Sequence, residues 1–451
     1  MKLPAIHRPA PLRILAVLLS GIVFAPCAAA QEGMKLGAAG WSQISVVGHS
    51  SDTIGGADHN GKSALSWGAQ ISLTNRLSER LAIAAGVGLA AGHSLYTMPG
   101  DPTGYAPLGT GAYVSEANFT YNFAGSSLFL RGGMFPYVYN PDVKNLGLYL
   151  LRGPVYPGFV VSGFETKHVL PVANMVGLQL HHEVGNFRQD FILSSEMDYY
   201  PYFDLSPAYV AGYRVHPSLD LGAGVNFYHY IPVDGKLTTD KSYNYVQGDT
   251  AGNPVDTINI SFRGIKLMAR ASFDPKVFFG PLPLGPEDLK IYGEIALIGL
   301  DDTKAHSDMY GELHQRMPVM FGVNAPIFPI YGRRVLDHLS FEMEWYGAPF
   351  HDDMEPYLTG YNKPSPFPVG WFGTPSKNNN DDKNVTRDNW KWSLHGAKMV
   401  QNQVRLSFQV ANDHWRPGIY RGDGDTKLAK RQAIMVAPKD WYTSVKLAYF
   451  F

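Results

Sequence analysis

Stretches in which apolar and polar side chains alternate recur along this chain, and a period of two is the signature of an extended strand. In the stretch 65–74, Leu65, Trp67 and Leu73 fall on one face and small or polar residues fall on the other. Comparable stretches lie at 113–123, 265–273, 339–346 and 404–410. The pattern predicts an all-β chain in which each sheet has one oily face.

Two all-β architectures produce this alternation. A soluble sandwich turns its apolar face inward, whereas a transmembrane antiparallel β-barrel turns it toward lipid and its polar face toward the lumen. The stretches are about ten residues long, which suits a tilted membrane-spanning strand. Aromatic residues lie near several strand ends, for example Trp345, Trp390 and Trp441. These features favour the barrel.

The connectors between the predicted strands alternate between short and long, as expected for short periplasmic turns and long extracellular loops. Sixteen strands are predicted, within a range of 14–18, with starts near 35, 64, 80, 111, 127, 174, 187, 207, 219, 257, 288, 315, 336, 389, 404 and 440. An even count is typical of bacterial barrels. The connectors 274–287 and 325–335 are long and Pro-rich for the short-turn side.

The first thirty residues predict a secretory signal peptide. Basic residues precede the apolar run "ILAVLLSGIVFA", and Ala28 and Ala30 form a small-residue cleavage site before Gln31. The chain is therefore divided into a signal peptide, 1–30, and one barrel domain, 31–451. Cys27 is the only cysteine, so the barrel domain contains neither a disulfide nor a thiolate.

Composition excludes some functions. The formal net charge is −1, which argues against a nucleic-acid partner. After residue 30 no run of 18 apolar residues occurs, so helical membrane spans are not expected.

The last ten residues, "YTSVKLAYFF", resemble the C-terminal strand of Gram-negative outer-membrane β-barrel proteins. The matching positions are Val445, Leu447, Tyr449 and Phe451. The resemblance implies a location in the cell outer membrane, contact with its lipid, and recognition by the outer-membrane assembly machinery. A looser resemblance to porins makes a homotrimer plausible. No acidic "PEFGG"-like motif occurs, so no functional residue is carried over from the general porins.

Charged residues on the polar faces of the strands are predicted to line the pore. These pore-lining residues are Arg131, Arg214, Lys266, Arg270, Glu342, Glu344, Lys391, Arg405 and Lys446. A barrel of this size is too wide for side chains to fill, so the charges would face water and sort solutes. Alternatively, they form salt bridges with one another and confer no selectivity.

The connector 136–173 is rich in apolar residues and would be sticky if it were exposed. We expect one loop to fold from here into the lumen, with a short helix near 141–151 capped by Asn140. Asp142, Lys144 and Arg152 would then form the constriction. Small residues on the inner side of the third strand would leave room for the loop. An external cap or two additional strands are the alternatives.

The sequence thus predicts a porin-like channel for passive diffusion of small hydrophilic solutes, without catalysis and without a cofactor. A surface-structural or adhesive barrel with a plugged lumen is one alternative, and an outer-membrane hydrolase is another, although no GxSxG elbow occurs. Acidic loops at 351–356, 378–384 and 421–426 are interpreted as solvated charge, and no metal site is predicted.

Overall fold

A computed structural model describes most of the barrel domain. The described residues are 34–51, 59–93, 107–151, 173–195, 197, 203–233, 243–248, 254–260, 264–297, 300, 317–331, 333–345, 390–413, 415, 418–419, 430–431, 434–435 and 437–451. The predicted signal peptide, Arg152 and the three acidic loops lie outside these residues. Within them, no helix is long and apolar enough to cross a membrane.

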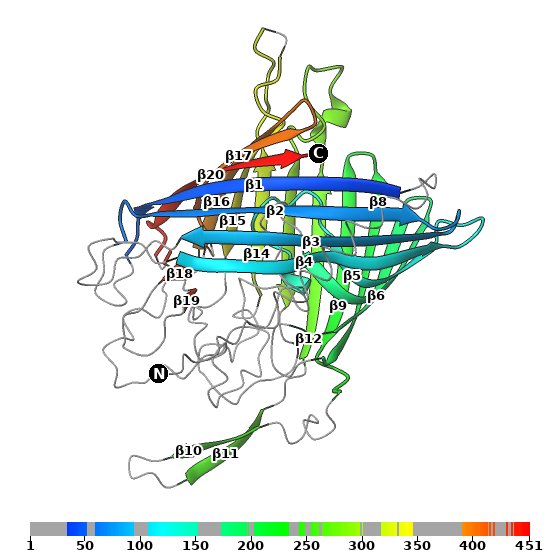
Figure 1. Ribbon diagram of the computed structural model, residues 1–451, viewed down its shortest axis with the longest axis vertical. Helices are drawn as coiled ribbons and strands as arrows, with labels where there is room; N and C mark the ends of the chain where they lie inside the picture. Colours follow the sequence, from blue (N-terminus) through cyan, green and yellow to red (C-terminus); the bar gives the residue numbers. More distant parts are fainter. Residues whose placement is uncertain are drawn as a thin grey trace, which may run out of the picture.

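Sixteen antiparallel strands form a closed barrel, as the sequence predicts (Figure 1). In barrel order they are β1 (Met34–His49), β2 (Ser63–Arg76), β3 (Leu81–His93), β4 (Pro107–Asn122), β5 (Phe129–Tyr137), β6 (Ala173–Val184), β7 (Phe187–Ser195), β8 (Leu205–His216), β9 (Leu219–Tyr228), β12 (Gly264–Phe273), β13 (Ile291–Leu297), β14 (Val319–Asn324), β15 (His338–Trp345), β16 (Trp390–Val400), β17 (Val404–Asn412) and β20 (Trp441–Phe450). Each strand pairs with its neighbours in the chain, so the topology is a simple up-and-down barrel.

The predicted strand start near 257 is wrong. The residues around it belong to β11 (Pro254–Ile260), which pairs with β10 (Tyr243–Gly248) in a separate two-stranded sheet apart from the barrel (Figure 1). The tenth barrel strand is β12, which begins at Gly264. Alternation in 254–260 resembles that of the next strand, and periodicity alone does not show which of the two joins the barrel. A second small pair, β18 (Gly418–Ile419) and β19 (Lys430–Arg431), also lies outside the barrel sheet.

The alternating faces have the orientation of a membrane barrel. Trp67, Phe191 and Leu406 point outward and are 50%, 50% and 47% exposed. Residues next to outward positions, such as Ser340 and Glu294, are buried on the inner side. Along the strands, apolar side chains are therefore exposed on the outer surface and polar side chains lie on the inner side.

The barrel closes where the last strand meets the first. β20 pairs with β17 on one side and with β1 on the other. The backbones of Ala38 and Phe451 exchange two hydrogen bonds, of 3.1 and 2.7 Å. Along β20, Val445 and Tyr449 are exposed on the outer face, and Phe451 is 81% exposed. The C-terminal segment is thus a closing strand with apolar side chains exposed on the outer face.

The two Pro-rich connectors on the short-turn side are tied together. Arg334 forms a bidentate pair with Asp288, with nitrogen–oxygen distances of 2.8 and 2.9 Å. The 3₁₀ helix η5 (Pro275–Phe278) begins after Asp274, whose carboxylate accepts the backbone N–H of Lys276. These connectors make the links between barrel strands longer, and their described residues add no strand to the barrel.

Candidate functional site

The connector after β5 folds into the barrel, as predicted. Its described part, residues 138–151, is named the inserted loop here. It ends in the 3₁₀ helix η3 (Tyr149–Leu151), which contacts β9, β12 and β13. Leu146, Tyr149 and Leu150 are almost completely buried, in a cluster that includes Met268 and Met320 of the wall. Apolar burial of this kind stabilises the loop inside the barrel rather than in solvent.

The predicted helix near 141–151 is wrong, since only Tyr149–Leu151 is helical there. Gly147 and Leu148 have φ angles of +82° and +61°, which a right-handed helix does not allow. Asn140 does not cap a helix; its side-chain amide donates to Glu294 at 3.2 Å. The backbone N–H groups of the loop bind acidic side chains of the wall instead of carbonyl oxygens four residues earlier.

Glu342 of β15 is the principal anchor for the loop. Its carboxylate accepts the backbone N–H groups of Lys144, Asn145 and Leu146 at 2.6, 2.8 and 2.8 Å. It also accepts the phenolic O–H of Tyr292 of β13 at 2.8 Å. Three successive backbone donors converging on one carboxylate form an anion-binding turn, here occupied by a side chain of the wall.

Two further buried carboxylates hold the loop. Glu294 of β13 accepts the O–H of Tyr139 at 2.5 Å and the backbone N–H of Tyr149 at 2.8 Å. Glu344 of β15 accepts the O–H of Tyr149 at 3.1 Å. All three glutamates are at most 2% exposed. Because a buried carboxylate needs several donors, the loop and these wall residues stabilise one another.

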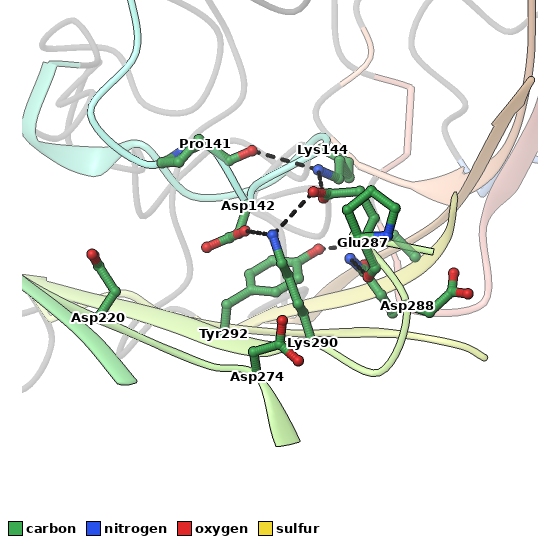
Figure 2. A network of polar contacts seen from close by, with 12 residues as sticks. Pro141, Asp142, Lys144, Asp220, Asp274, Glu287, Asp288, Lys290 and Tyr292 are labelled. Atoms are coloured by element: carbon green, nitrogen blue, oxygen red, sulfur yellow. Dashed lines mark hydrogen bonds and ion pairs between the residues drawn. The ribbon is translucent and has the colours of Figure 1, made fainter. Parts of the chain in front are cut away.

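Ion pairs fasten the loop at the edge nearest the short turns (Figure 2). The Nζ of Lys290 lies 3.0 Å from Asp142 of the loop and 3.0 Å from Glu287. Glu287 in turn pairs with Lys144 of the loop at 3.0 Å. Burial alone would raise the pKa of Glu287, but the two ammonium groups outweigh it and lower the pKa to about 2. Glu287 is therefore ionised at every physiological pH.

The loop also reaches walls beyond β13 and β15. The side-chain amide of Asn145 donates to Asp413, just after β17, at 2.5 Å. Asn226 of β9 donates to the carbonyl oxygen of Leu150 at 3.0 Å. The loop is thus tied to elements from β9 round to β17, and it spans the interior between them.

The small residues of β3 do face inward, but the described part of the inserted loop does not pack on them. A side chain at Gly88 would meet the ring of Tyr113, and one at Gly68 of β2 would meet Trp41. Aromatic rings of β1 and β4 therefore occupy the space beside these glycines. Small residues in a strand mark a close approach, and the approaching group here is a neighbouring strand's ring.

The predicted pore-lining cations fall into different environments. Arg270 is buried and pairs with Asp220 at 2.8 Å, and Asp220 also binds Arg188 at 2.7 Å. Arg131 lies over the rings of Phe129 and Phe135. Arg214, beside the short turn after β8, is exposed.

Lys266 and Lys391 are each only 1% exposed. Lys391 donates to the side chain of Asn412 at 3.3 Å and to the carbonyl oxygen of Met435 at 2.5 Å. Arg405 and Lys446 are half-buried on the inner face of β17 and β20. The structure thus brings Glu342 and Glu344 together with Asp142 and Lys144 at the loop, and places Arg405 and Lys446 on another part of the wall.

Several residues of this site were not singled out from the sequence. Asp220, Asp413 and His338 have ordinary strand or turn contexts, and their partners are distant in the chain. Glu294 follows the inward alternation of β13, so its orientation was predictable. Its role as an anchor was not, because Tyr139 and Tyr149 carry no sequence signal for it. Among the described residues, no group of three His, Cys, Asp or Glu side chains could hold a metal ion.

Solved structures of porins resemble this chain in fold. Pseudomonas putida OprB, in a high-pH structure, superimposes with a TM-score of 0.51 at 10% identity, covering 93% of this chain and 94% of that chain. The fold is porin-like. A mutant of the Rh. blastica porin gives a TM-score of 0.45 at 9% identity, over 93% of this chain and 100% of that chain. Salmonella typhi OmpF in complex with daunomycin gives 0.44 at 8%, over 93% and 97%.

No family model and no curated protein matches the chain. With identities near one residue in ten, the likeness to OprB extends to the fold and not to individual residues. Function therefore has to be argued from the residues of this barrel.

Proposed function

We propose that this protein is a porin-like channel of the bacterial outer membrane, through which small hydrophilic solutes diffuse passively. The observation that carries the proposal is a closed sixteen-strand barrel with an apolar exterior, a charged interior and a loop anchored across that interior. A barrel of this strand number encloses an aqueous channel unless something fills it. No reaction is assigned to the protein.

In this proposal the inserted loop narrows the passage. Asp142 and Lys144 are held at fixed positions by Lys290 and Glu287, so their charges border the route past the loop. Arg152 continues the same connector. The inner-wall residues Arg131, Arg405 and Lys446 contribute to the field that solutes meet.

The proposal extends to biogenesis and assembly. The lipid-facing positions Val445, Leu447, Tyr449 and Phe451 form the segment that the outer-membrane assembly machinery would read, after removal of residues 1–30. A homotrimer is the expected assembly, and its interface would lie on the outer surface.

The decisive experiment is conductance in planar lipid bilayers. Purified protein should give stepwise, stable current increments in KCl. Deletion of residues 140–150 should enlarge the increments, because it removes the segment that crosses the interior. An absence of increments from correctly folded protein would refute the channel.

A plugged, surface-structural barrel is the second candidate. The near-complete burial of Lys266, Glu344 and Lys391 favours it, because lumen residues beside an open aqueous passage would be more exposed. It predicts no conductance in the native protein and the appearance of conductance after deletion of residues 140–150.

A further inference from the structure

Four consecutive strands carry basic or imidazole side chains on one part of the inner wall. These are His338 of β15, His395 of β16, Arg405 of β17 and Lys446 of β20. Their direction follows from their neighbours in the chain: Leu406 is 47% exposed and Val445 is 46% exposed on the outer face. Since side chains alternate along a strand, Arg405 and Lys446 point into the barrel.

The strand register places these side chains in adjacent rows. Lys446 is the pairing partner of Ser407, Ser407 of Ala397, and Ala397 of His338. Arg405 lies one inward position from this row on one side, and His395, which pairs with Gln409, lies one inward position from it on the other side. With strands about 4.8 Å apart, the row spans about 14 Å of wall.

Two members of the group are in direct contact. The Nε2 of His338 lies 2.9 Å from Nδ1 of His395, and the two rings stack at 5.1 Å. Arg405, Lys446 and Lys144 of the inserted loop all act electrostatically on His395. Lys446 in turn lies over the ring of Trp41, 5.7 Å from its centroid.

Two carboxylates around this group, Asp337 and Glu287, are already engaged. Asp337 accepts from the Nζ of Lys398 at 2.7 Å and from the backbone N–H of Met399 at 2.6 Å. Glu287 is shared between Lys144 and Lys290. Within the described part of the chain, Arg405 makes no ion pair or hydrogen bond.

The opposite arrangement is found farther round the barrel. There, Asp220 lies between Arg188 and Arg270 and accepts a hydrogen bond from each. The cations of that region are therefore compensated by a carboxylate in direct contact. On the wall from β15 to β20, Glu342 and Glu344 are occupied by the inserted loop, and no carboxylate of the described residues is in direct contact with Arg405. The hydroxyl groups of Ser407 and Ser444 face the same part of the interior.

We propose that Arg405 and Lys446, with His395 beside them, form a binding subsite on the lumen wall for a small oxyanion, a phosphate or carboxylate group. A guanidinium offers paired donors to such a group, an ammonium offers a point charge, and an enclosed site strengthens both. Rows of Arg and Lys in a pore select anions by the same physics. The inference rests on the proposed channel function and names the class of solute that the channel would favour.

The test compares the native protein with the double variant R405Q/K446Q in planar bilayers. Chloride current through single channels is titrated with inorganic phosphate and, separately, with acetate. Phosphate should reduce the native current in a saturable manner, and the double variant should bind phosphate at least about tenfold more weakly, the factor expected from loss of one charge-assisted hydrogen bond. A KCl gradient should also give a reversal potential shifted toward cation preference in the variant.

R188Q is the matched control. It removes an inner-wall arginine whose partner Asp220 retains Arg270, so phosphate affinity should remain native. Circular dichroism and heat-dependent gel mobility establish that each variant forms the barrel. Saturation by acetate as well as phosphate would identify a general oxyanion subsite, and saturation by phosphate alone would restrict it to phosphate groups.

Failure of this inference can be distinguished from failure of the channel. Native protein that conducts but shows equal phosphate affinity in R405Q/K446Q overturns the subsite and leaves the channel intact. If the native protein does not conduct, titration calorimetry of the detergent-solubilised protein with phosphate decides the subsite alone. Heat of binding lost in R405Q/K446Q and kept in R188Q supports it, and no saturable heat in the native protein overturns it.

Discussion

The ammonium group of Lys290 lies 3.0 Å from the carboxylate of Asp142, although the two residues are 148 positions apart in the chain. Lys290 immediately precedes β13, and Asp142 lies in the inserted loop. Because Lys290 also contacts Glu287, and Glu287 contacts Lys144, four charges of alternating sign connect the loop to the wall (Figure 2). This chain of charges gives the loop a predictable response to acid.

Acid should loosen the loop through Glu287. Its pKa falls from 4.5 to about 2, because the opposite charges of Lys144 and Lys290 outweigh the effect of burial. A depressed carboxyl pKa contributes stability that is present above about pH 4.5 and is lost as the pH falls toward 2. The E287Q variant should therefore be less stable than the native protein at pH 7, and the difference should shrink between pH 4.5 and 2.

Thermal unfolding at pH 7, 5, 3 and 2 measures that difference. An exposed carboxylate serves as the control: E79Q, in the turn between β2 and β3, should leave the melting temperature unchanged at each pH. A gap between E287Q and native protein that stays constant down to pH 2 would show that the ion pairs are not its source.

Removal of the main anchor should release the loop. In E342Q, an amide replaces the carboxylate that receives three backbone N–H groups, and the amide can accept through one oxygen only. Each buried donor left without a partner costs about 1–3 kcal/mol. We expect faster proteolysis within residues 138–151 and, if the protein conducts, larger current increments.

The exposed Glu183, near the end of β6, provides the comparison for this variant. E183Q removes the same charge without touching the loop, so its proteolysis rate should equal that of the native protein. Native-like protection of the loop in E342Q would mean that apolar packing of Leu146 and Tyr149, rather than the carboxylate, holds the loop in place.

The backbone at Gly147 should tolerate no side chain. Its φ of +82° is in the left-handed region, and a Cβ there would lie 2.8 Å from Cε of Met320. Gly125 has a similar φ, +70°, in a turn where nothing lies within 4 Å. G125A therefore measures the backbone cost alone, roughly 1 kcal/mol.

We expect G147A to cost more than G125A, because it adds a collision in a packed cluster to the same backbone strain. Melting temperatures and loop proteolysis of the two variants give the comparison. Equal costs would indicate that the Met320 side chain, which is flexible, moves aside without penalty.

The sequence predicts the barrel well because each strand is specified by the alternation of its own residues. Each strand repeats apolar outward and small or polar inward residues, so Trp67 and Leu406 could be assigned to the outer face without any knowledge of their neighbours. Fifteen of the strands start close to the predicted positions, and the exception at 257 arises because two adjacent segments have the same alternation. Local periodicity does not encode which segment pairs with β9.

The interior could not be derived in the same way. That the connector after β5 enters the barrel follows from its apolar content, but its conformation is set by Glu294, Glu342 and Glu344, which are distant in the chain. A capping residue, Asn140, suggested a helix, but three wall carboxylates accept the backbone N–H groups that a helix would use. Tertiary hydrogen bonds override local propensity at such a site.

The assignment of the outer face can be tested by placing a charge on either side of one strand. Ile71 of β2 is 40% exposed on the outer surface, and its neighbour Gln70 points inward, where it accepts from the O–H of Tyr113 at 3.4 Å. I71R would place a guanidinium in hydrocarbon, at a cost of about 2–4 kcal/mol near the middle of the bilayer. In Q70R the same group lies on the lumen side, so the cost should be much smaller. Unfolding in lipid vesicles by guanidinium chloride gives both values, and equal destabilisation by I71R and Q70R would mean that the apolar face of β2 does not contact lipid.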